Sequence, residues 1–328
     1  MQNTNSDQQP DNLQQWEMLR SQIRDTFWQR LGEMPPLFTP QPTVTHDVQR
    51  DGYRLQRIIF ENGAGAMIFG YLLLPDQRSD PAPVLLYNHF HGGKYDLGKN
   101  ELFLDRLADP PLATALTGAG YIVLAIDAYC FGERQSQGPA GEREAGAATE
   151  LSLFKKFLWE GSTLWGMMVR DDLLALNYLL SRQDVDSARI GTTGMSLGGS
   201  RATWLAALDE RIKVTVPVAQ MNRYRDFADK GDFTRHGIYY YIPGALSTGF
   251  DMEHIVSLTA PRPQIILIGD QDPHSPIEGV RKIDSYVQSI YRLYDAEQNY
   301  RMIIYEGTGH IYSPDMYTAM LEALREYL

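Results

Sequence analysis

The sequence has 328 residues, of which 43% are hydrophobic, and it carries a formal net charge of −11. This length and hydrophobic content suffice for one large α/β domain and exclude a chain that is disordered throughout. An acidic protein repels phosphate backbones and anionic lipid headgroups, so we expect neither a nucleic acid nor a membrane as a partner.

The first fifty residues predict a polar tail followed by one accessory helix. Residues 1–10 are polar enough to be disordered. Residues 11–34 carry apolar side chains at helical spacing and are followed by two prolines, which predicts a helix packed on the rest of the protein. The start of the chain lacks the basic residues and the apolar run of a signal peptide, and no later run is long enough to span a membrane. Together with the single cysteine, Cys130, these features predict a cytoplasmic protein.

From residue 51 onward, apolar strands alternate with helices. Residues 53–61 and 66–75 predict a hairpin joined by an Asn-Gly-Ala-Gly turn, and therefore antiparallel strands at one edge of the sheet. Further strands are expected at residues 82–88, 121–127, 189–194, 212–219, 262–270 and 300–307, with helices at 110–120, 164–180, 198–209, 276–294 and 313–328. This alternation predicts a mostly parallel sheet with helices on both faces, in one α/β domain over residues 51–328.

Two segments interrupt the alternation. The first excursion, residues 129–163, is rich in glycine, alanine and charged residues, and the second excursion, residues 221–258, is rich in aromatic residues. Each follows a predicted strand, so each is expected at the carboxyl ends of the strands, where open α/β sheets bind their ligands. Long excursions at that edge are usually functional, with simple surface decoration as the alternative.

The most informative stretch is Gly194–Gly198, which reads Gly-Met-Ser-Leu-Gly. It matches the pattern Gly-x-Ser-x-Gly, which is too short to be specific by itself. Here a predicted strand precedes it and a predicted helix follows it, as in a nucleophile elbow, where a serine lies in a strained turn and glycines leave room around it. Ser196 is therefore the candidate nucleophile, against the alternative of a surface serine in a glycine-rich turn.

A serine hydroxyl needs a base to remove its proton and a carboxylate to orient that base. After an elbow of this kind the chain order is serine, acid and histidine. His310, just past the last predicted strand, is the histidine that satisfies this order, because His274 lies too close to the candidate acids. The preceding strand leads into Asp270 and Asp272. Asp272 lies further out in the loop and is preferred, with Asp270 as the alternative.

The reaction also needs N–H donors for a developing oxyanion. One is the backbone N–H of Leu197, directly after the candidate nucleophile, and the other is expected from the loop after the strand at residues 82–88. In that loop the N–H of His91 is the candidate, with Phe90 beside it. His89 and His91 raise the alternative of a metal site. No third ligand accompanies them at a suitable spacing and the motif His-Glu-x-x-His is missing, so we expect neither a metal nor a cofactor.

Four motifs follow one another along the chain: Asn-His-Phe-His-Gly-Gly, Gly-Met-Ser-Leu-Gly-Gly, Gly-Asp-Gln-Asp-Pro-His-Ser-Pro and Gly-Thr-Gly-His. In this order and setting the sequence resembles the α/β-hydrolase superfamily. It is similar in particular to the dienelactone-hydrolase-like and acetyl-xylan-esterase-like branch, which neighbours the catalytic domains of prolyl oligopeptidases. The resemblance covers roughly residues 50–328 and implies an α/β-hydrolase fold for that part of the chain.

The resemblance also bears on the site residues. The family typically places its acid in a Gly-x-x-Asp segment, here Gly269–Asp272, which favours Asp272. Dienelactone hydrolases proper use a cysteine nucleophile, so the serine at position 196 favours ester hydrolysis instead. The Arg-Gly-Gln and Gly-x-Ser-Gln-Gly segments of sugar-deacetylating esterases are missing, since Leu197 occupies the position of the glutamine. An acetylated sugar is therefore only one option among the ester substrates.

We expect a serine hydrolase that cleaves small or short-acyl carboxylic esters through an acyl-enzyme. Phe90, Tyr239 and Tyr240 are the candidates for substrate binding, and for the tyrosines simple packing is the alternative. A serine peptidase of the prolyl-oligopeptidase-like type is the second hypothesis, although the chain is too short to hold a gating propeller. A non-catalytic binding protein on the same fold is the third, and such proteins commonly lack the histidine or the acid. The oligomeric state stays open.

Overall fold

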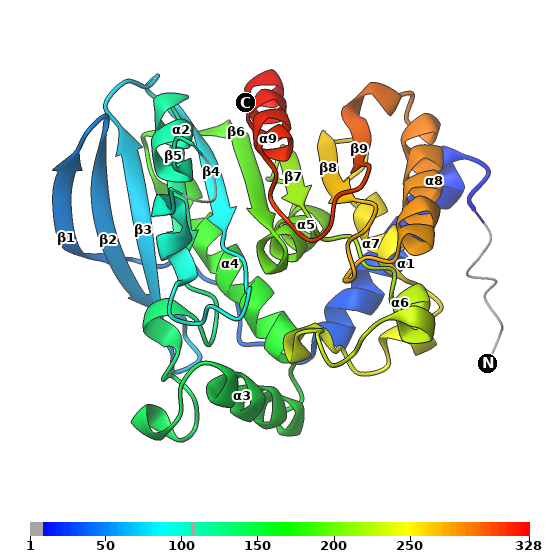
Figure 1. Cartoon of the computed structure of the whole chain (residues 1–328), viewed down its shortest axis with the longest axis horizontal. Helices are drawn as coiled ribbons and strands as arrows, with labels where there is room; N and C mark the ends of the chain where they lie inside the picture. The colour runs from blue at the N-terminus through cyan, green and yellow to red at the C-terminus, as the bar shows by residue number, and fades with distance from the viewer. Residues whose placement is uncertain (1–8, 106–108) are drawn as a thin grey trace.

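The computed structural model describes residues 9–105 and 109–328, so most of the predicted tail lies outside the described residues. Its centre is one nine-stranded sheet (Figure 1). The strands are β1 (Thr43–Arg50), β2 (Tyr53–Glu61), β3 (Met67–Pro75), β4 (Ala82–Asn88), β5 (Ile122–Ile126), β6 (Val185–Met195), β7 (Val214–Val218), β8 (Gln264–Gly269) and β9 (Tyr300–Tyr305). Their spatial order is β1-β2-β3-β5-β4-β6-β7-β8-β9.

The pairing of neighbouring strands changes once across the sheet, from antiparallel to parallel. The neighbours β1–β2, β2–β3 and β3–β5 pair antiparallel, and every neighbour from β5 to β9 pairs parallel. The predicted hairpin is thus β2 and β3, at the antiparallel end of the sheet. Because the parallel strands all end at one edge, the loops that follow β4, β6, β7, β8 and β9 emerge together.

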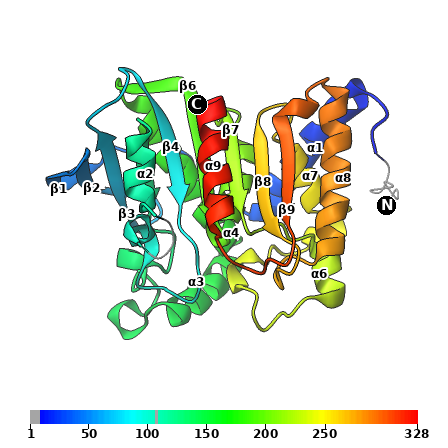
Figure 2. The same ribbon diagram turned by 45° about the horizontal axis from the view of Figure 1, so that its top comes forward.

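Helices cover both faces of this sheet. They are α1 (Leu13–Leu31), α2 (Leu112–Gly118), α3 (Ala147–Trp159), α4 (Leu164–Ser181), α5 (Leu197–Leu208), α6 (Tyr224–Lys230), α7 (Met252–Ser257), α8 (Ile277–Leu293) and α9 (Pro314–Tyr327). Helices α2 and α9 pack on one face, and α1, α4, α5, α7 and α8 contribute to the core on the other (Figures 1 and 2). Successive side chains of β4 point to opposite faces of the sheet. Leu85 and Tyr87 lie in the core beneath α2 and α9, and Val84 and Leu86 lie in the larger core beneath the other helices. The predicted α/β architecture is confirmed.

The N-terminal helix packs on the body as expected. Asn12 caps α1, accepting a hydrogen bond from the N–H of Gln15 at 3.0 Å. Trp16, Phe27 and Leu31 are fully buried in the larger core. Within the described residues, no helix combines the length and apolar character that crossing a bilayer requires.

Some elements differ from the prediction. Strand β1 was not expected, and it lies in the segment assigned to the tail and accessory helix. All eight of its residues are exposed, so it has no buried apolar face that the sequence pattern would reveal. Helix α3 lies in the first excursion and α6 and α7 in the second, and Figure 1 shows α3 and α6 beyond the edge where the parallel strands end.

Candidate active site

Ser196 joins β6 to α5 with a backbone that few residues adopt. Its φ is +55° and its ψ is −118°, and its N–H donates to the carbonyl of Val218 at 2.9 Å. A Cβ on Gly198 would lie 1.9 Å from the carbonyl oxygen of Asn88, and one on Gly194 would lie 2.2 Å from the same atom. The glycines of the motif are therefore required because the strained turn packs directly on the end of β4.

The side chains expected to surround Ser196 are brought together from the ends of three strands. The hydroxyl of Ser196 lies 2.9 Å from Nε2 of His310, and Nδ1 of His310 lies 2.7 Å from Oδ2 of Asp272. Because the carboxylate accepts at Nδ1, that nitrogen carries the proton, and Nε2 is free to accept from the serine hydroxyl. The loops after β6, β8 and β9 thus bring together the candidate nucleophile, base and acid.

The two candidate acids occupy different environments. The carboxylate of Asp272 is fully buried, and its second oxygen accepts from the N–H of His274 at 2.8 Å. Asp270 is half-buried at the end of β8, and its carboxylate accepts from the N–H of Thr308 at 3.3 Å. The carboxylate at the imidazole of His310 is that of Asp272.

The loop after β4 contains His91, whose N–H is the candidate oxyanion donor. The N–H of Phe90 is already used, since it donates to Oε2 of Glu101 at 2.6 Å. Among the described residues, the N–H groups of His91 and Leu197 donate to no protein atom. The carbonyl of Phe90, in the same peptide unit as the N–H of His91, lies 2.9 Å from Nδ1 of His89. Buried side chains therefore fix the orientation of this peptide.

Burial shifts the pKa values of Glu101 and His89, the two side chains that hold the loop after β4. Burial raises the pKa of Glu101 to about 8, although bonds from Tyr87 and Phe90 oppose this. Burial also lowers the pKa of His89 well below its usual value. His89 is therefore neutral, with its Nδ1–H donating to the carbonyl of Phe90 and its Nε2 accepting from the N–H of Ala128 at 3.0 Å.

The imidazole of His91 is also held in one orientation. Its Nδ1 accepts from the N–H of Gly93 at 2.9 Å, so its Nε2 carries the proton and points at Oε2 of Glu150, 3.2 Å away. Tyr95 donates to the same carboxylate oxygen at 3.2 Å. Glu150 belongs to α3, so this contact ties the first excursion to the loop after β4.

A catalytic cleft of about 580 Å³ contains the hydroxyl of Ser196 and the imidazole of His310. The first excursion contributes Glu150 and the second contributes residues 234–240, so both excursions line it. The candidates Tyr239 and Tyr240 are among these lining residues. The candidate Phe90 does not line the cleft, because its side chain packs against Gly92 and on the core beneath α2 and α9.

Other lining residues were not singled out from the sequence. His274 lies with its ring 4.6 Å from that of His310, and burial together with the neighbouring imidazole lowers its pKa. The sequence feature that could have pointed to His274 is its position, two residues after Asp272. Glu150 and His236 had no comparable signal, because each lies inside an excursion without a motif. In the described part of the chain, no three His, Cys, Asp or Glu side chains are grouped as metal ligands.

Two family models and a curated relative match this chain. The family model described as acetyl xylan esterase (AXE1) matches residues 11–229, and the one described as prolyl oligopeptidase family matches residues 155–327. A Bacillus subtilis (strain 168) protein named "Putative hydrolase YtaP" is 36% identical over 294 residues, which cover 89% of this chain and 94% of the relative.

Solved structures share the fold at lower sequence identity. A "putative acetyl xylan esterase" from Bacteroides fragilis has a TM-score of 0.75 at 19% identity, covering 97% of this chain and 90% of its own. A glucuronoyl esterase from Solibacter usitatus has a TM-score of 0.68 at 16% identity, covering 96% of this chain and 93% of its own. At these identities the likeness concerns the fold.

Proposed function

Because the chain belongs to the acetyl-xylan-esterase-like branch of the α/β-hydrolase superfamily and is a carboxylic-ester hydrolase, we propose that Ser196, His310 and Asp272 are its catalytic triad. The observation that carries this proposal is the continuous line of hydrogen bonds, 2.9 Å from Ser196 to His310 and 2.7 Å from His310 to Asp272. It ends at a strained elbow that presents the hydroxyl to the catalytic cleft.

The proposed reaction is a two-step acyl transfer. The oxygen of Ser196 attacks the ester carbonyl while Nε2 of His310 takes the proton, and Asp272 stabilises the imidazolium that forms. His310 then returns the proton to the leaving alcohol, which leaves an acyl-enzyme on the serine. Water, deprotonated by the same nitrogen, attacks the acyl-enzyme and releases the acid.

The oxyanion of each tetrahedral intermediate is proposed to bind the N–H groups of Leu197 and His91. The N–H of Leu197 lies in the first turn of α5, where helix amides have no partner within the helix. His89 donates to the carbonyl of the peptide that contains the N–H of His91, and Glu101 holds the preceding peptide through the N–H of Phe90. Donors that need no reorientation stabilise the developing charge most strongly.

The substrate class is proposed to be small or short-acyl esters. Acetyl xylan is named for relatives of this chain, and the polar backbone of Gly92 and Gly93 faces the catalytic cleft beside Thr234 and Arg235. A polar alcohol portion, such as a carbohydrate, would find hydrogen-bond partners there.

Replacing Ser196 with alanine tests the mechanism. We expect turnover of p-nitrophenyl acetate to fall by about 10³-fold or more, since removal of one triad member abolishes acyl-enzyme formation. The control is Ser289→Ala on α8, whose hydroxyl bonds only to the carbonyl of Tyr286. A fluorophosphonate should label the wild-type serine and not the alanine variant. Ester hydrolysis retained in Ser196→Ala would refute the assignment.

A serine peptidase is the second candidate, favoured by the match to the prolyl oligopeptidase family model. Triad chemistry is the same for amides and esters, so the geometry of Ser196 does not separate them. Parallel assays with p-nitrophenyl acetate and a chromogenic peptide amide do. Cleavage of the ester alone supports the esterase, and efficient cleavage of the amide would favour the peptidase.

A further inference from the structure

Glu150 is the one residue with a carboxylate among the described residues that line the catalytic cleft. It lies in the first turn of α3 and is 5% exposed. The carboxylate of Asp272 is fully buried and does not line the cleft. The proposed acyl transfer gives Glu150 no part, so a carboxylate in the same cleft as Ser196 has no explanation in that reaction.

The two oxygens of Glu150 have different surroundings. Its Oε2 accepts from Nε2 of His91 and from the hydroxyl of Tyr95, each at 3.2 Å. The described residues donate no hydrogen bond to its Oε1, which is also not one of the unpartnered side-chain atoms that are sealed from solvent. Oε1 is therefore an accessible acceptor in the cleft, within reach of a bound substrate.

Packed aromatic rings hold this carboxylate in place. The ring of His91 stacks on that of Tyr239 with centroids 5.5 Å apart, and the ring of Tyr95 stacks on that of Phe131 with centroids 4.9 Å apart. A Cβ on Gly146 would lie 3.0 Å from the side chain of Tyr95, so the start of α3 packs directly on this ring. An acceptor that is already ordered binds a partner at a low cost in conformational entropy.

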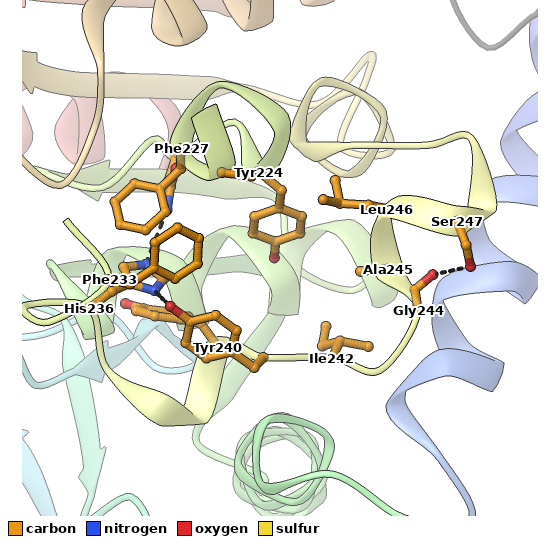
Figure 3. A pocket seen from close by; sticks show the side chains of 13 residues that line it. Tyr224, Phe227, Phe233, His236, Tyr240, Ile242, Gly244, Ala245, Leu246 and Ser247 are labelled. Atoms are coloured by element: carbon orange, nitrogen blue, oxygen red, sulfur yellow. Dashed lines mark hydrogen bonds between the residues drawn. The ribbon is translucent and has the colours of Figure 1, made fainter. Parts of the chain in front are cut away.

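The second excursion adds no further negative charge to the cleft lining. The ring of His236 stacks on that of Tyr240 with centroids 4.8 Å apart (Figure 3). Burial lowers the pKa of His236 to about 4, so this imidazole is neutral at physiological pH. The side chain of Arg235 is 69% exposed and pairs with Asp232 at 3.3 Å, so its charge lies where the cleft meets solvent. The negative charge inside the cleft is that of Glu150.

An ordered carboxylate oxygen with an accessible lone pair distinguishes between substituents of an ester. A hydroxyl group can donate to it, and hydrogen bonds to a charged acceptor are stronger than those between neutral groups. A methoxyl group of similar polarity cannot donate. A second carboxylate is repelled, and such repulsion is a common way to reject an unwanted ligand.

We propose that Glu150 determines specificity: its Oε1 accepts a hydrogen bond from a hydroxyl group of the ester substrate, and its charge excludes esters that carry a carboxylate. This proposal rests on the proposed function, because it takes the ester to be held at Ser196. It narrows the substrate class from small esters to uncharged esters that bear a hydroxyl group. The hydroxyl belongs to the acyl or to the alcohol portion of the ester, and the experiment below distinguishes the two.

Glu150→Gln changes the accessible atom and keeps the buried contacts. His91 and Tyr95 both donate, so the amide oxygen takes the place of Oε2 and the amide nitrogen takes the place of Oε1. The charge is lost, and the accessible acceptor becomes a donor that serves hydroxyl and methoxyl oxygens alike. The control is Glu142→Gln, which removes the same charge from an exposed residue of the first excursion outside the cleft.

Matched pairs of esters test the hydrogen bond. Methyl glycolate and methyl methoxyacetate carry the substituent in the acyl portion, and 2-hydroxyethyl and 2-methoxyethyl acetate carry it in the alcohol portion. In at least one pair we expect the wild-type kcat/KM to be about tenfold higher for the hydroxyl compound. That ratio should fall to about twofold or less in Glu150→Gln and stay unchanged in Glu142→Gln. The pair that responds identifies the portion of the ester that contacts Glu150.

A nearly isosteric pair tests the charge. Monomethyl succinate carries a carboxylate where methyl 4-oxopentanoate carries an acetyl group. We expect the ratio of kcat/KM for the anionic ester to that for the neutral ester to rise about tenfold in Glu150→Gln, and to change less than twofold in Glu142→Gln. Damage to the fold cannot produce such a gain.

The outcomes separate the two proposals. Ester hydrolysis by Ser196→Ala would overturn the proposed function itself. If that variant is inactive but Glu150→Gln leaves either the hydroxyl-to-methoxyl ratios or the anionic-to-neutral ratio at the wild-type value, only the proposal for Glu150 fails. Equal changes in Glu142→Gln would also overturn it. Loss of the hydroxyl preference together with a gain on the anionic ester, confined to Glu150→Gln, supports it.

Discussion

Several side chains around Ser196 have a partner that fixes their direction. His310 is held by Asp272, Asp272 by the N–H of His274, and the imidazole of His91 by Glu150. Such groups do not reorient during a reaction, which is how an active site lowers the free energy of a charged transition state. The buried carboxylate of Asp272 is central to this arrangement, because it selects the tautomer of His310.

Replacing each candidate acid with asparagine tests which one acts. Asp272→Asn removes the acceptor at Nδ1 of His310 and favours the wrong tautomer, so kcat for p-nitrophenyl acetate should fall roughly 10³- to 10⁴-fold. Asp270→Asn is the control, since its carboxylate contacts the N–H of Thr308 instead of the imidazole. We expect it to stay within a few-fold of wild type. The reverse ranking would assign the acid to Asp270.

Glu101 makes the stability of the protein depend on pH. Its pKa in the fold, about 8, lies above the unfolded value of 4.5, so the folded state binds more protons between these limits. The free energy of unfolding therefore decreases as pH rises from about 4.5 to about 8. Glutamine at this position resembles the protonated acid and can still accept from the N–H of Phe90 while donating to Tyr87.

Glu101→Gln should remove this pH dependence. Relative to wild type, the variant should gain stability as pH rises from 5 to 8, on the order of a few kcal/mol. Denaturant unfolding of both proteins at several pH values in this window measures the difference. Parallel pH profiles for the two proteins would contradict the raised pKa.

The elbow illustrates how two elements constrain one another. Helix α5 begins directly against the end of β4, and Gly198 is the contact point, where any Cβ would meet backbone atoms of Asn88 and His89. Backbone atoms cannot move aside as the end of a flexible side chain can. The distance between α5 and β4, and with it the position of Ser196 relative to the loop after β4, depends on this glycine.

Gly198→Ala is therefore expected to destabilise the fold by about 1–3 kcal/mol and to reduce esterase activity sharply, because the helix must move away from β4. The matched control is Gly118→Ala in α2, where a Cβ meets no atom within 4 Å. That change should be neutral or stabilising by up to about 1 kcal/mol, since alanine is the better helix former. Thermal unfolding and ester assays on both variants compare the two sites, and equal stability would contradict the steric argument.

The sequence predicts elements well where an apolar face recurs with a regular period. Helix α8 follows this rule, with Val280, Ile283 and Val287 on its buried face. Strands β4, β5 and β8 are recognisable instead as short, continuously apolar runs, because both faces of the sheet are covered. Strand β1 has no buried face, and α3 and α6 lie in excursions that pack by individual contacts. The residues around the candidate active site divide in the same way into predictable and unpredictable ones. Ser196, Asp272 and His310 follow strands, so motif and chain order locate them, whereas Glu150 reaches His91 only through the tertiary fold.

At the scale of the whole molecule, α1 connects distant parts of the chain. The indole of Trp16 donates to the hydroxyl of Tyr294 at 3.0 Å, at the end of α8. Arg20 and Arg24 both pair with Glu210, after α5. The helix thus joins the segments that precede β7 and β9. We infer that the N-terminal segment is part of the cooperative unit that positions the site.

Phe27 is the residue of α1 best placed to test this inference. It is fully buried, with its ring 5.6 Å from that of Trp204 on α5 and 6.4 Å from that of Phe250 in the second excursion, measured between centroids. Phe27→Ala should lower the free energy of unfolding by about 3–5 kcal/mol, because the cavity left behind borders both elements. Trp28→Ala removes the neighbouring aromatic side chain, which is 38% exposed, and should change stability by no more than about 0.5 kcal/mol. Chemical denaturation followed by circular dichroism compares the two variants. A small loss in Phe27→Ala, or a separate early transition for α1, would show that the helix is an appendage and not part of the cooperative fold.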